Sequence, residues 1–431
     1  MDHELGRAAP GSGFGGGTPI AARRGALRLV AGLGEVLVVL SAPVSVIWIP
    51  VARVPGAGNV TVSDAALVGL WALVAAALVL RGLGDVRAHA PSLALLATAI
   101  GVFAAIGSSL SGGIGPFEFS LTMKRFGLAS ILPLAAILFR SRATGTGMRL
   151  AAAGAVTALA VFTLFPDLQA WLPRPDAWDD VFAGEGRAVG PLTNPNDLAY
   201  AAIGLAFLHG ALLPRRLRLV DRVLLAVTLG AAATCVVSSG SRSAFLGLVA
   251  GLAFVLTSSR VALATRAVVL VAGAALFLAG MTWSTIFESR LTRAYRLGLS
   301  EENISSRLDA QVLAASLAVA NPLGVGFTSF ERVSARTSEA PFTTADSVYF
   351  DTLLGAGFPG LLCLLALVGI AWRHVGRAAA GASRPAALLR GGLVAFLVFG
   401  TATVVPISVF LAPIFFSLVG AASCADPDGA A

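Results

Sequence analysis

The sequence predicts an all-α polytopic membrane protein with about 12 transmembrane helices. Hydrophobic residues make up 56% of the 431 residues, charged residues only 13%, and the mean hydropathy is +0.83. Apolar runs of roughly 20 residues, the length that a helix needs to cross a bilayer, recur along the chain. A soluble globular domain usually contains about 25% charged residues, so this class is excluded.

Twelve apolar segments are long enough, or nearly long enough, to cross a bilayer as helices. The shorter ones need flanking residues to complete the span. The turn at 404–406 is the tightest, because two apolar segments meet there almost directly. The predicted helices are 29–49, 63–80, 91–110, 120–139, 149–165, 196–213, 222–238, 243–258, 266–283, 347–372, 388–404 and 406–422.

The arginines predict the orientation of these helices. Basic residues gather in every second connection, including 215–222 and 373–390. The connections between them hold few, such as Arg53 and the Lys124/Arg125 pair. Because cytoplasmic loops of membrane proteins are enriched in Lys and Arg, we expect the basic connections and both termini to be cytoplasmic.

The same orientation divides the chain into tails, a membrane domain and outer loops. Residues 1–25 are rich in Gly, Pro and Arg and are expected to form a disordered cytoplasmic tail. The membrane domain is 26–422, and 423–431 is a second cytoplasmic tail. Two long loops, 166–195 and 284–346, fall on the outer side. A loop as long as the second is uncommon unless it is functional.

The cysteines and histidines predict neither a metal centre nor a disulfide framework. Cys235 and Cys363 lie in apolar runs, Cys424 lies in the C-terminal tail, and the four histidines have no ligand-like spacing. We therefore expect no metal and no cofactor. The net charge of +8 does not indicate nucleic-acid binding, because basic cytoplasmic loops already account for it.

Four polar clusters fall on the predicted outer face, and the first is Arg187–Asn196. Pro195 suits the first turn of a helix, whose N-terminal amides would form an anion site. The guanidinium of Arg187 could add a planar fork for a phosphate. A capped helix end after a surface loop explains Asn194 and Asn196 equally well.

The second cluster is Ser238–Ser243, the turn between two predicted membrane helices, with Arg242 inside it. An arginine in such a turn can bind a phosphate. It can also simply extend its charged head to the membrane interface, which is the structural alternative.

The third cluster joins Arg307 to Asn321–Gly326. A short helix is expected over 305–320, capped by serine and with apolar residues at helical spacing. Gly324 and Gly326 would allow the backbone to approach a ligand closely. The alternative is a helix end followed by a turn. No strand precedes the glycines, so a dinucleotide fold is not implied.

The fourth cluster contains Asp346–Tyr349 and Gly357–Gly360. Asp346 stands at the expected start of a membrane helix, where a carboxylate is also a favourable cap. Asp351 is a second carboxylate, at membrane depth, where an ionisable group needs a partner or water. The Gly-Phe-Pro-Gly sequence predicts a kink in this helix.

The order and spacing of these clusters resemble the O-antigen ligase and polymerase superfamily, which are membrane glycosyltransferases that use polyprenyl-pyrophosphate-linked glycans. The resemblance covers about 187–365 of the chain. The matching residues are Arg187 before Gly190 and Asn194-Pro195-Asn196, then Ser241-Arg242, then Arg307 before Asn321-Pro322-Leu323-Gly324-Val325-Gly326, and finally Asp346-Ser347-Val348-Tyr349 before Gly357-Phe358-Pro359-Gly360.

The chain departs from the family pattern at one position. The pattern has a histidine, thought in ligases to help activate the acceptor hydroxyl, where this chain has Asp346. The remaining histidines all map to the predicted cytoplasmic side or near it, so none can replace the missing one. Three explanations stay open: Asp346 is the base, the acceptor is activated in another way, or the chain does not catalyse ligase chemistry.

The resemblance implies an enzyme of the plasma (inner) membrane with its active site on the extracytoplasmic face. No metal is needed, because arginines and a helix N-terminus can neutralise the pyrophosphate leaving group. The implied partners are a polyprenyl-pyrophosphate-linked oligosaccharide, a glycan acceptor, the lipid bilayer, a flippase and a chain-length regulator. The implied catalytic residues are Asp346, Arg187 and Arg307, and the implied substrate-binding residues are Arg242, Asn194, Asn196, Gly324, Gly326, Ser347 and Tyr349.

Within this class, polymerisation for cell-surface or exopolysaccharide assembly is favoured over ligation, because the ligase histidine is missing. Two alternatives are a multi-spanning solute transporter and a non-catalytic polysaccharide-assembly protein. A transporter is expected to carry ionisable groups or broken helices near the middle of the membrane. Here the polar clusters gather on one predicted face, which favours the enzyme.

Overall fold

The structure is a computed structural model of the chain. It describes residues 18–46, 49–54, 58–81, 89–165, 167–168, 188, 191–192, 194–214, 216–258, 266–267, 302–329, 333, 345–378, 383–401 and 411–424.

The N-terminal part consists of three helices and a small β-ribbon. Its elements are α1 (Thr18–Ser45), β1 (Pro50–Val54), β2 (Gly58–Thr61), α2 (Val62–Arg81) and α3 (His89–Leu110). β1 and β2 pair antiparallel. α2 begins with reciprocal bonds, because the Thr61 amide donates to Asp64 Oδ2 at 2.8 Å and the Asp64 amide donates to Thr61 Oγ1 at 3.2 Å. The ribbon was not predicted from the sequence.

The next elements are a helical segment that changes its winding and a long regular helix. They are α4 (Gly115–Thr122), the π-helical turn η1 (Met123–Gly127), the 3₁₀ turn η2 (Leu128–Ile131), α5 (Leu132–Leu138) and α6 (Arg142–Leu164). Ser141 caps α6 by accepting a hydrogen bond from the Thr144 amide at 3.0 Å.

The second half of the chain contributes the helices that carry the polar clusters. They are α8 (Pro195–Ala211), α9 (Leu219–Ser239), α10 (Arg242–Thr257), α13 (Glu302–Ala320), the 3₁₀ turn η5 (Phe327–Ser329), α15 (Val348–Ala378), α16 (Ser383–Gly400) and α17 (Leu411–Ala421). The expected helix over 305–320 is therefore present as α13, and it begins three residues earlier, at Glu302. Acidic residues are favourable in a first helical turn.

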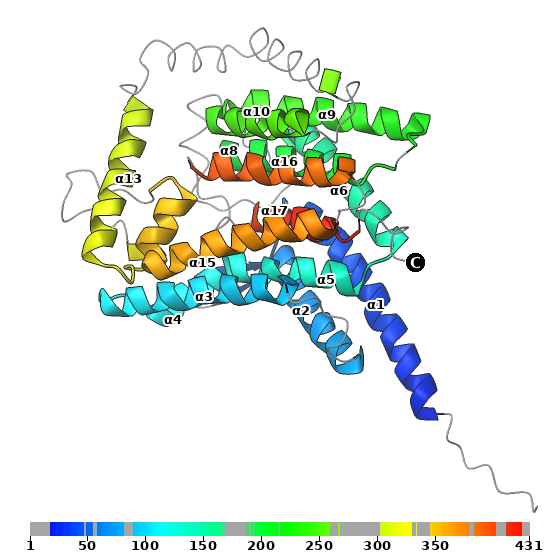
Figure 1. Ribbon diagram of the computed structural model, residues 1–431, viewed down its shortest axis with the longest axis horizontal. Helices are drawn as coiled ribbons and strands as arrows, with labels where there is room; N and C mark the ends of the chain where they lie inside the picture. Colours follow the sequence, from blue (N-terminus) through cyan, green and yellow to red (C-terminus); the bar gives the residue numbers. More distant parts are fainter. Residues whose placement is uncertain are drawn as a thin grey trace, which may run out of the picture.

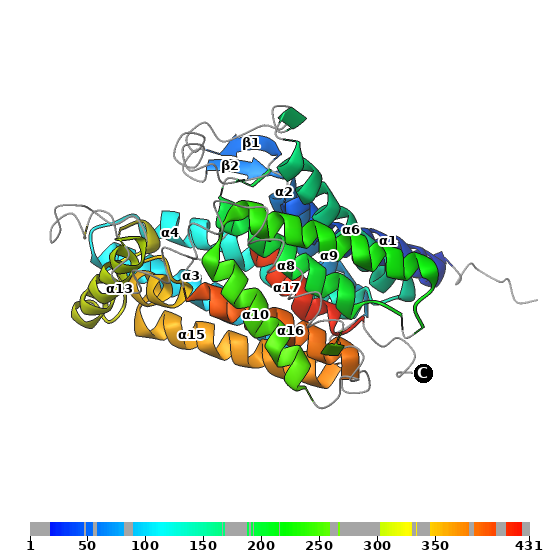
Figure 2. The same cartoon turned by 90° about the horizontal axis from the view of Figure 1, so that it is seen from above.

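Many helices lie side by side along one direction, whereas α1, α2 and α13 run across it (Figure 1). In Figure 1, α8, α9, α10 and α16 form one group, and α3, α4, α5 and α15 form another. α13 (yellow) stands across the end of both groups, and the view from above places it at the same end (Figure 2).

Close packing of small residues shows the relative direction of α10 and α16. A Cβ on Gly247 of α10 would lie 2.7 Å from the Ala395 carbonyl oxygen of α16, and one on Gly251 would lie 2.5 Å from the Gly391 oxygen. Residue numbers rise along α10 as they fall along α16, so these helices are antiparallel. Small residues at helix interfaces allow this close approach in membrane proteins.

The described helices fit an all-α membrane protein. Each predicted helix overlaps a described helix, apart from 266–283, of which only 266–267 is described. Six described helices are long and apolar enough to cross a membrane. They are Arg23–Ser45, Val62–Leu80, Pro91–Leu110, Arg142–Leu164, Leu219–Ser239 and Val348–Arg377. The count of twelve spans and the orientation stay predictions.

Candidate functional site

The predicted kink in α15 is present at Gly357, whose φ of 70° and ψ of −170° are not helical. Pro359 explains why the helix breaks here. In an unbroken helix the Gly355 carbonyl would accept from the amide of residue 359, but proline has no N–H. The break therefore leaves carbonyl groups that need other donors.

The glycine motif Asn321–Gly326 supplies these donors. The Val325 amide donates to the Leu354 oxygen at 2.8 Å, and the Gly326 amide donates to the Gly355 oxygen at 2.9 Å. In return the Phe358 amide donates to the Pro322 oxygen at 3.0 Å. The motif thus closes the hydrogen bonds that the broken helix leaves open.

Both motif glycines are surrounded by protein. Gly324 has a φ of 85°, and a Cβ there would lie 2.6 Å from the Gly355 oxygen and the Gly357 nitrogen. Gly326 has a φ of 90°, and a Cβ there would lie 2.7 Å from the Ser108 side chain of α3. These contacts require glycine without invoking a ligand. The predicted substrate-binding role of Gly324 and Gly326 stays a prediction.

A buried carboxylate on α4 holds the segment that follows the glycine motif. Glu118 is fully buried. Its Oε2 accepts from the Phe327 amide at 3.0 Å, and its Oε1 accepts from the Thr328 amide at 2.9 Å and from the Thr328 hydroxyl. The amides belong to η5, so Glu118 caps this short turn. Sequence reasoning missed Glu118, because a single glutamate in an apolar segment gives no signal of its partner.

Two of the three predicted catalytic residues, Arg307 and Asp346, come together. Arg307 lies on α13, and Asp346 lies two residues before α15. Arg307 Nε is 3.6 Å from Asp346 Oδ2, and the side chains are 27% and 41% exposed, respectively. The pair is therefore charged, partly accessible and supplied by two separate elements.

Asp346 has an unusual backbone conformation. Its φ is 50°, and among the described residues it alone combines a side chain with a positive φ. Aspartate tolerates this left-handed region better than most residues, yet the conformation is uncommon and marks turns and functional sites.

Ser347 and Tyr349, predicted to bind substrate, donate to backbone carbonyls of α16. Ser347 Oγ is 3.3 Å from the Gly400 oxygen, and the Tyr349 hydroxyl is 3.1 Å from the Leu397 oxygen. These bonds fasten the start of α15 to the end of α16. A substrate-binding role for either residue is not tested by this geometry.

Asn194 is the N-cap of α8, because its side chain accepts a hydrogen bond from the Asn196 amide at 2.8 Å. Pro195 occupies the first helical position, as predicted. Arg187 lies outside the described residues. Ala188, the next residue in the chain, donates from its amide to the Ser238 oxygen at 3.0 Å, at the end of α9.

Arg242 is the first residue of α10, directly after the cap Ser241, whose side chain accepts from the Ala244 amide at 3.3 Å. Gly240, with a φ of 60°, ends α9 in the left-handed conformation. The turn therefore presents Arg242 at the N-terminus of a helix, beside the segment that contains Ala188.

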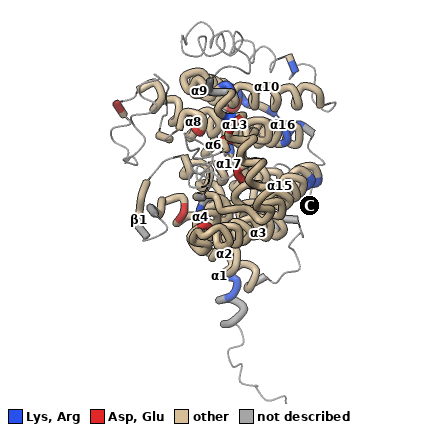
Figure 3. Tube along the Cα trace, turned by 90° about the vertical axis from the view of Figure 1, so that its left-hand side faces the viewer, with Lys and Arg blue, Asp and Glu red and all other residues tan. Residues whose placement is uncertain are grey.

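The polar clusters share one end of the bundle. The starts of α8, α10 and α15 all lie where α16 ends, because each of these helices runs antiparallel to α16. α13 also reaches this end, since Gln311 Nε2 donates to the Thr401 oxygen at 3.2 Å. Figure 3 looks at this end, with α13 facing the viewer. This arrangement is consistent with the prediction that the polar clusters lie on one face of the membrane.

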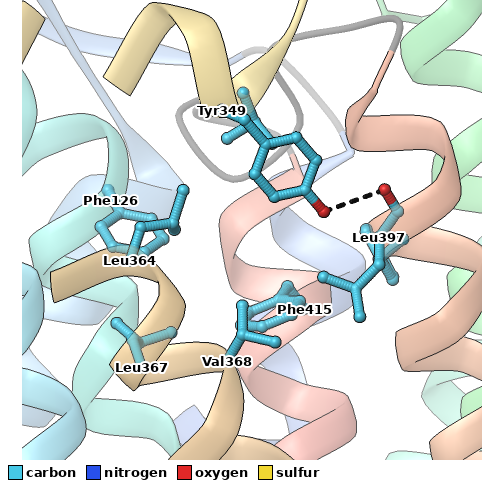
Figure 4. A pocket seen from close by; sticks show the side chains of 9 residues that line it. Phe126, Tyr349, Leu364, Leu367, Val368, Leu397 and Phe415 are labelled. Atoms are coloured by element: carbon cyan, nitrogen blue, oxygen red, sulfur yellow. Dashed lines mark hydrogen bonds between the residues drawn. The ribbon is translucent and has the colours of Figure 1, made fainter. Parts of the chain in front are cut away.

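An apolar pocket begins beside Tyr349 and is enclosed by α15, α16, α17 and η1 (Figure 4). Val348 precedes the break in α15 and Leu364 follows it, yet both line the pocket. In a continuous helix they would be about 24 Å apart. The break at Gly357 therefore bends α15 around the pocket. The lining residues are Phe126, Val348, Tyr349, Leu364, Leu367, Val368, Phe396, Leu397 and Phe415.

Within the described residues, no group of three or more His, Cys, Asp or Glu side chains could hold a metal ion. This bears only on that part of the chain.

Comparison with known protein families gives a match to part of the chain. The sequence profile of the family described as O-antigen ligase matches residues 225–365, which include Arg242, Arg307 and Asp346. No curated protein matches the chain significantly. The match indicates an O-antigen ligase/polymerase type of function, and this family implies a lipid-linked oligosaccharide substrate in a membrane.

Proposed function

We propose that this chain belongs to the O-antigen ligase-related superfamily and is a glycosyltransferase that acts on a polyprenyl-pyrophosphate-linked glycan at the outer face of the plasma (inner) membrane. The observation that carries the proposal is the ion pair between Arg307 and Asp346. It joins a cation and a carboxylate from separate elements at the end of the bundle where α8, α10 and α15 begin.

The cationic side of the site would hold the donor. Arg307, Arg242 and Arg187, together with the amides at the start of α8, would neutralise the pyrophosphate. Charge-assisted hydrogen bonds from arginine suit phosphate oxygens, and a helix N-terminus is a ready anion site. The hydrogen bond that the Ala188 amide donates to the Ser238 oxygen supports this arrangement, because Ala188 follows Arg187 in the chain and Ser238 precedes the turn that carries Arg242.

The transfer itself would be a substitution at the sugar carbon that bears the pyrophosphate. The acceptor hydroxyl oxygen forms the new bond to this carbon as the bond to the pyrophosphate oxygen breaks. Prenyl pyrophosphate leaves with the electron pair, and Asp346 takes the hydroxyl proton. A carboxylate can accept this proton late, when the acceptor oxygen has become acidic. No added divalent metal is needed in this scheme.

Of the two reactions, polymerisation is favoured over ligation. The reason is the identity of residue 346. The family pattern has a histidine where this chain has an aspartate, so the acceptor is activated differently from that of the ligases. A flippase that supplies the donor and a chain-length regulator are the expected partners of a polymerase. The outer loop 284–346, of which α13 forms part, would cover the site and select the acceptor.

The test is release of prenyl pyrophosphate from a synthetic prenyl-pyrophosphate oligosaccharide by the purified protein, with EDTA present. We expect release by the wild type and loss of release in Arg187→Ala, Arg242→Ala and Arg307→Ala, each with unchanged expression and membrane insertion. Arg222→Ala, an exposed arginine on α9, is the matched control and should stay active.

Two outcomes would overturn the proposal. Full activity of all three arginine variants would show that these arginines are not needed to neutralise the pyrophosphate. Solute uptake into proteoliposomes without prenyl-pyrophosphate release would identify a transporter instead. Asp346→Asn tests the base separately, because activity retained in this variant would remove Asp346 from the mechanism.

A further inference from the structure

A second carboxylate, that of Asp351, contacts the residue that precedes Asp346. It belongs to the first turn of α15 and is only 7% exposed. Its Oδ1 accepts a hydrogen bond from the Ala345 amide at 2.8 Å. Its Oδ2 is buried and has no hydrogen-bond partner among the described residues. A buried carboxylate with a hydrogen bond to only one of its two oxygens is unfavourable for stability, so it calls for a functional explanation.

The bond from Ala345 to Asp351 spans the strained residue. The Asp351 amide donates to the Ser347 oxygen at 2.8 Å, while its side chain accepts from Ala345. Residue 351 thus holds the chain on both sides of Asp346, whose φ is 50°. For an L-residue the left-handed conformation is unfavourable, so the turn needs bonds that maintain it.

We propose that Asp351 is a positioning residue, which holds the turn at 345–347 so that the Asp346 carboxylate faces Arg307. The inference rests on the proposed function, in which Asp346 is the base. Asp351 acts through Asp346 and does not touch the substrate, because its side chain is buried whereas that of Asp346 is 41% exposed.

Two variants distinguish the effect of the Asp351 hydrogen bond from the effect of its charge. Asp351→Asn keeps an oxygen that can accept from Ala345, whereas Asp351→Ala removes it. With Asp351→Ala we expect kcat for prenyl-pyrophosphate release to fall about 100-fold with little change in the KM for the donor, because the base is displaced while the donor site stays intact. With Asp351→Asn we expect kcat within about threefold of the wild type. Arg222→Ala, at an exposed arginine on α9, is the control and should have no effect.

A second measurement, amide hydrogen exchange, tests the stability of the turn at 345–347 directly. Hydrogen exchange at the amides of 345–347 should be faster in Asp351→Ala than in the wild type, and close to the wild type in Asp351→Asn. Exchange in α13 should stay unchanged in both variants. This measurement needs no enzymatic activity. Unchanged exchange outside 345–347 would show that Asp351→Ala is folded.

Wild-type kcat in Asp351→Ala, or loss of activity in Asp351→Asn equal to that in Asp351→Ala, would overturn the positioning role. The second result would mean that the charge or the proton of Asp351 matters rather than the bond to Ala345. Unchanged exchange at 345–347 in Asp351→Ala would also overturn it. If the wild type releases no prenyl pyrophosphate, the proposed function fails, and the exchange experiment still tests the turn.

Discussion

The glycine motif and the charged pair differ in what surrounds them, although both belong to the same family pattern. Gly324 and Gly326 face backbone and side chains of α3, α4 and α15, and the amide of Gly326 is bonded to a carbonyl that the break in α15 leaves open. Arg307 and Asp346 remain partly exposed and contact each other across two elements. One region is therefore built like a protein core and the other like a binding surface.

This difference indicates how the two regions divide the work. The glycine motif joins the end of α13 to the bend of α15, and Glu118 holds the chain that follows. These hydrogen bonds fix the C-terminal end of α13, and Arg307 lies near the N-terminal end of the same helix. Substitutions in the motif should therefore act on stability, and substitutions in the charged pair should act on activity. Four predictions test this division, in order of decreasing effect.

The charged pair should not tolerate exchange of its two charges. The double variant Arg307→Asp/Asp346→Arg keeps an ion pair. It moves the guanidinium away from α13, where we propose that it neutralises the pyrophosphate of the glycan donor. We expect prenyl-pyrophosphate release to fall about 100- to 1,000-fold, as when a preorganised charge-stabilising donor is lost. The unfolding temperature should fall only slightly, because arginine tolerates the φ of 50° at position 346 less well than aspartate. Recovery of activity by the double exchange, when each single exchange is inactive, would show that the pair is only structural.

Gly324→Ala should destabilise the protein. The added Cβ would lie 2.6 Å from the Gly355 oxygen, and the φ of 85° is unfavourable for alanine. We expect a loss of about 3 kcal/mol, measured as a lower thermal unfolding midpoint in detergent. Gly369→Ala on α15 is the control, because a Cβ there meets nothing within 4 Å. A stable but inactive Gly324→Ala protein would instead support a direct contact with substrate.

Glu118→Ala should loosen the segment after the glycine motif. It removes the acceptor of the Phe327 and Thr328 amides. Phe327 is half-buried and Thr328 is exposed, so each lost hydrogen bond should lower stability by about 0.5–1.5 kcal/mol, the usual net value of one hydrogen bond. Faster hydrogen exchange at 327–328 would show the loss, and Glu118→Gln should recover part of it, since an amide keeps one oxygen. Equal exchange in all three proteins would contradict a role for Glu118 in holding η5.

Tyr349→Phe should have the smallest effect. It removes one hydrogen bond, from the hydroxyl to the Leu397 oxygen of α16, and leaves the ring in the apolar pocket. We expect a loss of about 0.5–1.5 kcal/mol of stability and nearly unchanged turnover. If turnover fell tenfold or more at unchanged stability, Tyr349 would belong with the charged pair, as the sequence resemblance implies.

The sequence predicted the helices well, for a local reason. A span must supply about 20 apolar residues in succession, so its position can be read from the chain itself. The same holds for the break in α15, because Pro359 lacks an amide hydrogen and Gly357 accepts a positive φ. The caps at Asn194 and Ser241 were likewise marked by residue type. The β-ribbon over 50–61 was missed, because it is short and lies in a turn.

By itself, then, the sequence determined the membrane class, most helix positions, the kink and the candidates Arg242, Arg307 and Asp346. Only the tertiary structure decided that Arg307 meets Asp346, that Gly326 bonds to the Gly355 carbonyl, and that Glu118 binds a segment 209 residues later in the chain. The physical reason is the range of each effect. Apolar length and missing donors are local properties, whereas the partner of a freed carbonyl or a buried charge depends on which distant segment packs against it.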